Sequence, residues 1–371
     1  MADAKRYDAF DALRAIMMFL GVVIHSAINY SSSDDMTWPL RARDTSVVFF
    51  FLVDFIHAFR MPLFFMLAGF FAALLCINRG PGAMLKNRFK RILLPFVVFI
   101  IVLRPFLNFS FKYAAAVFDG QTPVSLSEHF SSLSSYIPYH LSHLWFLYYL
   151  FIMSVLAYGF SMVTRPVSLL PIDNFFKRIF KNPVVRLLTL TAVSFGILFL
   201  FGARSFETSV SWIPDFGILC YYMAFYLAGW LLYRNKELVD TLKNRAIVIT
   251  LFGIMAFCLK FYDEEHMNLI SLQMVNSLIT CSLSIGITGL FLRFADIPKK
   301  AITYFVNSAY WVYLVHLFIA ILLAGVLNDL PLSVFLKFLI VLSGTISVCL
   351  ITYQLFVRKT GIGVFLNGKK T

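Results

Sequence analysis

Ten stretches of about 20 mostly apolar residues run through the chain, and they limit its fold more than any other feature. A helix needs about 20 such residues to cross the hydrocarbon core of a bilayer. Composition agrees, since 60% of the 371 residues are hydrophobic, 14% are charged and the mean hydropathy is +0.80. We predict an all-α integral membrane protein, a bundle of about ten transmembrane helices at 12–30, 47–77, 93–111, 143–163, 187–203, 215–233, 246–262, 268–292, 301–326 and 332–357.

The charges between these stretches predict the orientation of the chain. Most of the 32 lysine and arginine residues fall in alternate connections and in the two tails, whereas acidic residues such as Asp119, Glu128 and Glu265 occupy the other connections. Basic loops remain in the cytoplasm, so both termini are predicted to be cytoplasmic. The net charge of +13 is spread over several loops instead of one face, and no nucleic-acid partner is expected.

The chain shows no low-complexity linker and no repeat of fixed period, which predicts a single polytopic membrane domain over residues 1–371. Its start, MADAKRYDAFDALRA, has acidic residues beside the first apolar stretch and no small-residue cleavage site. We therefore expect the first stretch to be retained as a signal anchor. The connection 112–142 is expected outside, as a lid whose Tyr113, Tyr136 and Tyr139 either stack on sugar rings or anchor helices at the membrane surface.

Several kinds of site are not indicated. The five cysteines lie in apolar stretches without paired spacing, so neither disulfides nor a zinc site is predicted: Cys76, Cys220, Cys258, Cys281 and Cys349. No H-E-x-x-H motif is present, and we expect no metal and no permanently bound cofactor. The absence of a G-x-S-x-G elbow and of a Walker loop argues against serine hydrolase chemistry and ATP-driven transport.

Ionisable residues inside the apolar stretches predict function, because such groups are costly in lipid and usually face a bundle interior or a wet cavity. In RAIMMFLGVVIH, Arg14 and His25 are separated by eleven residues, which places them on one helix face about 16 Å apart along the axis. Further such residues occur in other stretches: Asp54, His57, Arg60, Arg104 and His316. The alternative is structural, with Arg14 snorkelling to the interface and His25 packed on a carbonyl.

Five motifs, in order along the chain, resemble those of the membrane acyltransferase 3 family. They are FDALRAIMMFLGVVIHS with Arg14 and His25, FRMPLFFMLAGFF with Ala68 where serine is common, NRFKRILLPF, HLWFLYYL and SAYWVYLVH. The short ten-span form without an extracytoplasmic esterase domain is most similar to the branch that succinylates osmoregulated periplasmic glucans. The resemblance implies an enzyme of the bacterial inner membrane, with cytoplasmic acyl-CoA, best succinyl-CoA, as donor and a periplasmic glucan hydroxyl as acceptor.

The candidate residues fit transfer of an acyl group from a thioester to an alcohol. His25 is the predicted general base, because imidazole has an ordinary pKa of about 6.5, close to working pH. Tyr313 and His316 are predicted to stabilise the oxyanion or to bind sugar, against a core-packing role. No acyl-enzyme is required.

Donor and acceptor binding are assigned to other residues. Arg14, with Arg88 and Arg91 of the family's R-x-x-R pair, is predicted to hold the donor phosphates, although the pair also suits an ordinary cytoplasmic loop. The residues that orient the acceptor or the succinyl carboxylate are predicted to be Asp54, His57, Arg60 and His143, unless Asp54 and Arg60 form a structural salt bridge. The other histidines are expected in solvated loops: His129, His140 and His266.

Two other functions remain open. Related enzymes acetylate other surface polysaccharides, so an O-acetyltransferase is the first alternative. The second is a secondary transporter that uses the intramembrane histidine, arginine and aspartate residues as a pathway. Transporters commonly contain two repeated halves, and no such duplication is seen in this sequence.

Overall fold

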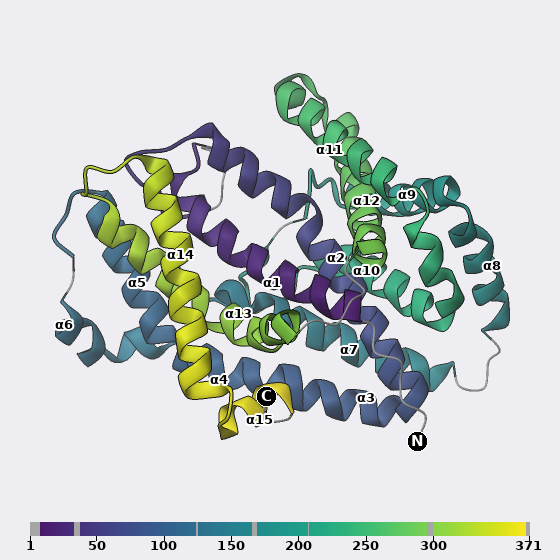
Figure 1. Ribbon diagram of the computed structural model, residues 1–371, viewed down its shortest axis with the longest axis horizontal. Helices are drawn as coiled ribbons and strands as arrows, with labels where there is room; N and C mark the ends of the chain where they lie inside the picture. Colours follow the sequence, from purple (N-terminus) through teal and green to yellow (C-terminus); the bar gives the residue numbers. More distant parts are fainter. Residues whose placement is uncertain are drawn as a thin grey trace. The chain divides into compact units, whose positions relative to one another are not determined.

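The computed structural model describes residues 8–32, 38–123, 125–164, 169–206, 208–294 and 300–368. Residues 1–7, on which the retained-anchor prediction partly depends, lie outside these ranges. Within them the regular elements are helices, with one isolated bridge between Ser31 and Ser46. The α-helices (Figure 1) are α1 (Asp8–Ala27), α2 (Val47–Arg79), α3 (Pro81–Arg88), α4 (Leu94–Val102), α5 (Arg104–Phe118), α6 (Leu126–Ser131), α7 (Trp145–Val163), α8 (Leu170–Lys181), α9 (Pro183–Phe201), α10 (Phe216–Arg234), α11 (Ala246–Asp263), α12 (Leu269–Phe294), α13 (Lys300–Leu327), α14 (Val334–Thr352) and α15 (Gly361–Asn367).

Short 3₁₀ and π segments connect several of these helices. They are η1 (Ile28–Tyr30), η2 (Phe89–Leu93), η3 (Leu133–Tyr136), η4 (Ser142–Leu144), η5 (Lys236–Lys243), η6 (Glu264–His266) and η7 (Tyr353–Val357). Helices are the expected elements, because the bilayer core offers no water to the backbone and a helix satisfies its own N–H and C=O groups.

The predicted all-α, multi-pass membrane architecture is confirmed. In the described part of the chain, nine helical stretches are long and apolar enough to cross a membrane. A tenth span results if Pro81–Val102 and Arg104–Phe118, which are bent by 51° relative to each other, are counted as one. The cytoplasmic placement of both termini stays a prediction.

The third predicted span, 93–111, was wrong in its limits. The segment begins at Pro81, because α3, η2 and α4 continue one another, so the loop predicted there shrinks to Gly80 with φ +87°. A positive φ of this size favours glycine. The helix then bends at Leu103, where Pro105 supplies no N–H to the ladder. The second half, α5, extends to Phe118, well into the predicted connection 112–142.

The described helices form two compact units. The first consists of Met1–Arg14, His57–Ile92 and Trp145–Ile302, and the second of Ala15–Ile56, Leu93–Leu144 and Thr303–Thr371. Each unit is therefore assembled from three separate segments of the chain, and α1 and α2 each contribute residues to both.

Close helix crossings organise the first unit, in which α12 packs against α9 and α11 (Figure 1). A Cβ at Gly69 of α2 would overlap the carbonyl oxygen of Tyr226 on α10, and a Cβ at Gly229 would overlap that of Met66. The two backbones are thus in direct contact. Small residues permit such crossings in membranes, where close van der Waals packing holds helices together.

An ion pair fastens the amphipathic helix α8 within the same unit. Asp173 accepts hydrogen bonds from Nε and Nη2 of Arg234 at 2.9 and 2.5 Å, and from Asn235 at 3.3 Å. Because the guanidinium stabilises the charged carboxylate, the pKa of Asp173 is held below its ordinary value.

Helix α13 forms the core of the second unit. Tyr113 of α5 lies against Gly325, where an added Cβ would be 3.1 Å from the tyrosine ring. Trp311 donates to the hydroxyl of Thr352 on α14 at 3.0 Å, and its ring lies 5.9 Å from that of Phe99 on α4. These contacts bring α4, α5 and α14 against α13.

Candidate active site

Three histidines from distant parts of the chain meet in the second unit. His25 lies near the end of α1, His143 lies in η4, and His316 lies on α13. The ring centroids of His25 and His316 are 5.3 Å apart, and those of His316 and His143 are 5.4 Å apart. The histidines predicted from separate stretches therefore form one cluster, with His316 in the middle.

Hydrogen bonds hold η4 against α13 in the position that this cluster requires. The hydroxyl of Tyr313 donates to the carbonyl of His143 at 2.7 Å, and Nε2 of His143 contacts the carbonyl of Leu314 at 2.9 Å. Ser142, directly before His143, has a left-handed φ of +48°. Tyr313, predicted to touch the reacting groups, thus also has a positioning role.

The backbone contacts assign the tautomers of two of these rings. Nδ1 of His316 lies 3.0 Å from the carbonyl of Val312 and 2.8 Å from that of Tyr313. A carbonyl oxygen only accepts, so in the neutral ring Nδ1 carries the proton and Nε2 the lone pair. By the same reasoning Nε2 of His143 carries the proton and Nδ1 the lone pair. His316 therefore presents a basic nitrogen.

Two residues beside the cluster, Trp38 and Asn29, were not predicted from the sequence. The ring of Trp38 lies 5.5 Å from that of His25 and 5.4 Å from that of Phe111 on α5. Its Nε1 donates to Oδ1 of Asn29 at 2.7 Å, and Asn29 is fully buried. A buried asparagine at the end of the first apolar stretch was the available signal, because buried amides need hydrogen-bond partners.

Two of the predicted donor-binding arginines come together in the first unit. Arg14 forms an ion pair with Asp11, with Nη2 of the arginine 3.1 Å from Oδ1 of the aspartate. Its Cζ lies 5.2 Å from the ring centroid of Phe71. Arg88, at the end of α3, interacts electrostatically with Arg14 and with Tyr226. Its Nε and Nη2 are buried and have no hydrogen-bond partner among the described residues. This guanidinium has donors to offer to an anion.

The other predicted binding residues, Arg91 and the three ionisable residues of α2, do not form one cluster in the structure. Arg91 lies half-buried in η2. Asp54, His57 and Arg60 are half-buried on α2, with Asp54 in the second unit and the other two in the first. Each of the four interacts with neighbouring groups.

Two ionisable residues have structural roles. Arg104, buried at the bend before α5, donates Nε to the carbonyl of Ile137 at 3.0 Å and Nη1 to that of His140 at 3.5 Å. The prediction that His129 is a solvated loop residue was wrong, because it is buried with Nε2 3.0 Å from the carbonyl of Pro105. His140 and His266 are exposed, as predicted.

The described ranges bring no set of metal-ligating side chains together. They contain no group of three or more histidine, cysteine, aspartate or glutamate residues with ligand geometry. The five cysteines are free thiols.

A comparison of the sequence with protein families decides the class of this chain. The family described as an acyltransferase domain matches residues 7–354. The chain belongs to the acyltransferase 3 family. With its apolar helices, this membership makes it a multi-pass membrane acyltransferase. Both residues of the first motif, Arg14 and His25, and two of the three of the last, Tyr313 and His316, lie in the arrangements described above.

Two curated relatives of this acyltransferase carry the name glucans biosynthesis protein C. They come from Escherichia coli strains SMS-3-5 and K12, and each is 24% identical over 378 residues, which cover 99% of this chain and 95% of the relative. No solved structure matches the chain significantly.

Proposed function

We propose that this acyltransferase is an O-acyltransferase of the bacterial inner membrane that moves a succinyl group from cytoplasmic succinyl-CoA to hydroxyls of a periplasmic glucan. The family supports acyl transfer, and the name of the relatives supports a glucan as acceptor. Residues 1–371 act as one catalytic domain, because the family match extends through segments of both units.

The three-histidine cluster supplies the base for this reaction. As the glycan oxygen forms a bond to the acyl carbon, His25 takes the hydroxyl proton. The C–S bond then breaks to release the coenzyme A thiolate, which takes that proton back from the imidazolium and leaves the base neutral. His316 stands beside His25 with a lone pair on Nε2 to share the proton. Positioned proton transfer contributes about 10² to 10⁴ in rate.

Backbone contacts hold the other two rings of the cluster in place. The carbonyls of Val312 and Tyr313 fix the ring of His316, and the carbonyl of Leu314 fixes that of His143. A preorganised ring spends no energy on reorientation when the reaction occurs. His143 and Tyr313 thereby border the place where the acceptor hydroxyl arrives.

The arginines of the first unit hold the donor. Guanidinium groups match phosphate oxygens in a bidentate way, which a lysine point charge does not. Arg88 contributes buried donors next to Arg14, and Arg91 follows it in η2. Asp54, His57 and Arg60 orient the acceptor or the free carboxylate of the succinyl group. No metal or resident cofactor takes part.

The observation that carries the proposal is the cluster of His25 with His316, one residue from the first motif and one from the last. The test is acyl transfer by purified protein with labelled succinyl-CoA and an unsubstituted periplasmic glucan. Wild type should release coenzyme A and label the glucan, and the His25→Ala and Arg14→Ala variants should lose both products.

The same preparation separates the alternatives. Preference for acetyl-CoA over succinyl-CoA would replace the donor, and transfer to another polysaccharide but not to glucan would replace the acceptor. Movement of either substrate into sealed vesicles without acyl transfer would identify a transporter and overturn the enzyme.

A further inference from the structure

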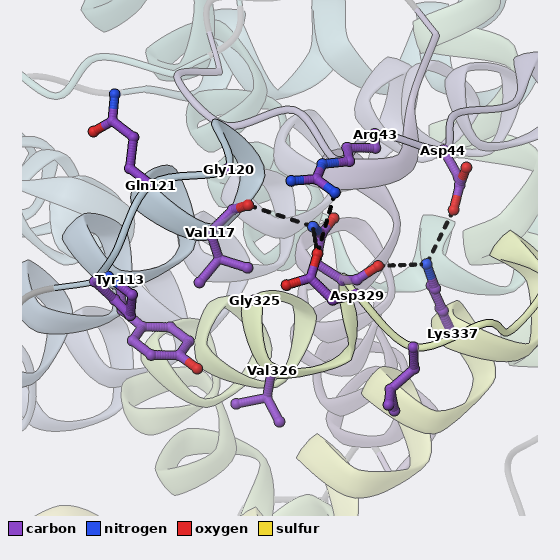
Figure 2. A pocket seen from close by; sticks show the side chains of 13 residues that line it. Arg43, Asp44, Tyr113, Val117, Gly120, Gln121, Gly325, Val326, Asp329 and Lys337 are labelled. Atoms are coloured by element: carbon purple, nitrogen blue, oxygen red, sulfur yellow. Dashed lines mark hydrogen bonds and ion pairs between the residues drawn. The ribbon is translucent and has the colours of Figure 1, made fainter.

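A partly open cavity of about 700 Å³ lies in the second unit, apart from the contacts that form the histidine cluster (Figure 2). It is lined by the chain before α2, the end of α5, the end of α13 and the start of α14. Gly120 has φ +71°, and a Cβ there would be 3.0 Å from Nη2 of Arg43. Glycine at this turn therefore keeps room for the arginine.

The charges that line the cavity are balanced. Arg43 pairs with Asp329 at 3.4 Å, and Lys337 pairs with Asp44 at 3.0 Å. Nζ of Lys337 also donates to the carbonyl of Asn328 at 2.8 Å, and this lysine is only 3% exposed. Two cations face two anions, so the wall offers hydrogen-bond donors and acceptors without a net charge. Such a wall favours a neutral ligand rich in hydroxyl groups over a phosphate or a carboxylate.

An aromatic ring completes this polar wall. Figure 2 shows Tyr113 on one side of the cavity, with Val326 nearby and the Lys337–Asp44 pair on the other side. Gly325 leaves room for the Tyr113 ring beside α13, because a Cβ at residue 325 would be only 3.1 Å from Cδ1 of that ring. An amphipathic ring beside charged hydrogen-bonding groups suits a sugar, which has apolar C–H faces and a rim of hydroxyls.

Helices α5 and α13 both line the cavity, α13 carries His316, and α5 carries a residue that contacts Trp38 beside the cluster. On α5, Phe111 contacts Trp38, which contacts His25, and Tyr113 follows two residues later. On α13, Gly325 lies nine residues after His316, about 13.5 Å along the helix axis. A ligand that reaches from the cavity to the cluster must therefore be longer than one sugar.

We propose that this cavity is a subsite for the acceptor glycan, which binds a neutral hexose unit several sugars away from the hydroxyl that is acylated. The proposal rests on the proposed function for the identity of the ligand. Tyr113 stacks on the sugar, and the Arg43–Asp329 and Lys337–Asp44 pairs bind its hydroxyls.

Direct binding tests the subsite without any acyl donor. Full-length protein in detergent is titrated calorimetrically with a series of neutral linear glucan oligosaccharides, from glucose upward. Tyr113→Ala should weaken binding of the longer oligosaccharides at least about tenfold, whereas Tyr113→Phe, which keeps the ring, should stay within about twofold. Tyr262→Ala is the matched control, because Tyr262 is 90% exposed and belongs to the first unit.

The acyl-transfer assay then separates this subsite from the proposed function. Tyr113→Ala should raise the KM for long glucans and leave kcat and the KM for acyl-CoA unchanged. Glucan binding that depends on Tyr113, without any acyl transfer, would overturn the proposed function and keep the subsite. Acyl transfer with an unchanged glucan KM in Tyr113→Ala would overturn the subsite alone.

A second variant guards against misfolding. Asp329→Asn removes a charge at a side chain that is 65% exposed, so it should fold like the wild type and still weaken glucan binding. If Tyr113→Ala unfolds, unchanged glucan binding by the folded Asp329→Asn variant overturns the proposal. Preference for an anionic oligosaccharide over the neutral one overturns it as well.

Discussion

The imidazole rings of His25 and His316 lie 5.3 Å apart, although one belongs to α1 and the other to α13. If the two rings share the proton of the acceptor hydroxyl, they act as one unit. Removal of either should then cost about as much as removal of both, because residues of one catalytic unit are strongly non-additive.

This relationship predicts the kinetics of three variants. His25→Ala and His316→Asn should each lower kcat by about 10² to 10⁴, and the double variant should be no more than a few-fold slower than the slower single one. Asparagine keeps an N–H donor near the carbonyls of Val312 and Tyr313 and removes Nε2, so the unfolding temperature of His316→Asn should stay close to that of wild type.

Steady-state rates with saturating donor and acceptor measure the effect. His266→Ala is the control, because this histidine is exposed and pairs only with Asp263 at the surface among the interactions described for it. If the loss of kcat in the double variant equals the product of the two single losses, the rings act independently. If His316→Asn keeps the kcat of wild type, His316 does not take part in the reaction.

A second prediction concerns the donor phosphates. Arg88→Gln should raise the KM for acyl-CoA about tenfold or more, because buried guanidinium donors next to Arg14 would lose their phosphate. The KM for the corresponding acyl-pantetheine, which lacks the nucleotide phosphates, should not change. The exposed Arg178→Gln serves as the control. An equal rise in KM for both donors would mean that Arg88 supports the fold and does not bind phosphate.

The sequence predicted which segments form membrane-spanning helices better than it predicted where the helices begin, end or bend. Nine spans follow from apolar length alone, because the bilayer forces long apolar segments into helices. The third span was misjudged, since basic residues near Arg88 suggest a loop although the helix from Pro81 continues past them as a π segment. A bend at Leu103 depends on Pro105 and on the hydrogen bond from Arg104 to Ile137, a tertiary contact.

The site divides in the same way. His25 and His316 are ionisable residues in apolar stretches. They could be predicted as functional residues because an ionisable group in lipid is costly. Their meeting with His143 and Trp38 depends on contacts between distant segments, which no local pattern contains. His129 was misplaced for the same reason, because a loop histidine is buried once its segment packs on Pro105.

A third prediction follows from the ion pair between Asp173 and Arg234. The pKa of Asp173 is lowered in the folded protein, so its stabilisation is complete above the ordinary aspartate pKa of about 3.9 and is lost as the pH falls through the lower folded pKa. At pH 7, Asp173→Asn should reduce the free energy of unfolding by about 1 to 3 kcal/mol. The difference from wild type should shrink as the pH falls below about 4.

Thermal unfolding across this pH range measures the effect. Asp240→Asn is the matched control, because Asp240 is 80% exposed and its pair with Lys243 lies at the surface, where ion pairs contribute little. A difference between Asp173→Asn and wild type that is the same at every pH would show that the carboxylate charge does not stabilise α8.

The crossing of α2 and α10 gives the fourth prediction. An added methyl at Gly69 or Gly229 would overlap a carbonyl oxygen of the opposite helix, so the two backbones must separate to admit it. In ordinary helix interiors glycine is about 1 kcal/mol less favourable than alanine, and Gly159→Ala and Gly196→Ala, where the added Cβ meets nothing within 4 Å, should leave stability equal or slightly higher. Gly69→Ala and Gly229→Ala should instead lower the unfolding temperature and the yield of folded protein.

Because Tyr226 lies on this crossing and interacts with Arg88, any folded Gly69→Ala protein should also show a higher KM for acyl-CoA. Thermal unfolding of the four variants in one detergent decides the matter, and four equal unfolding temperatures would show that α2 and α10 do not cross in contact.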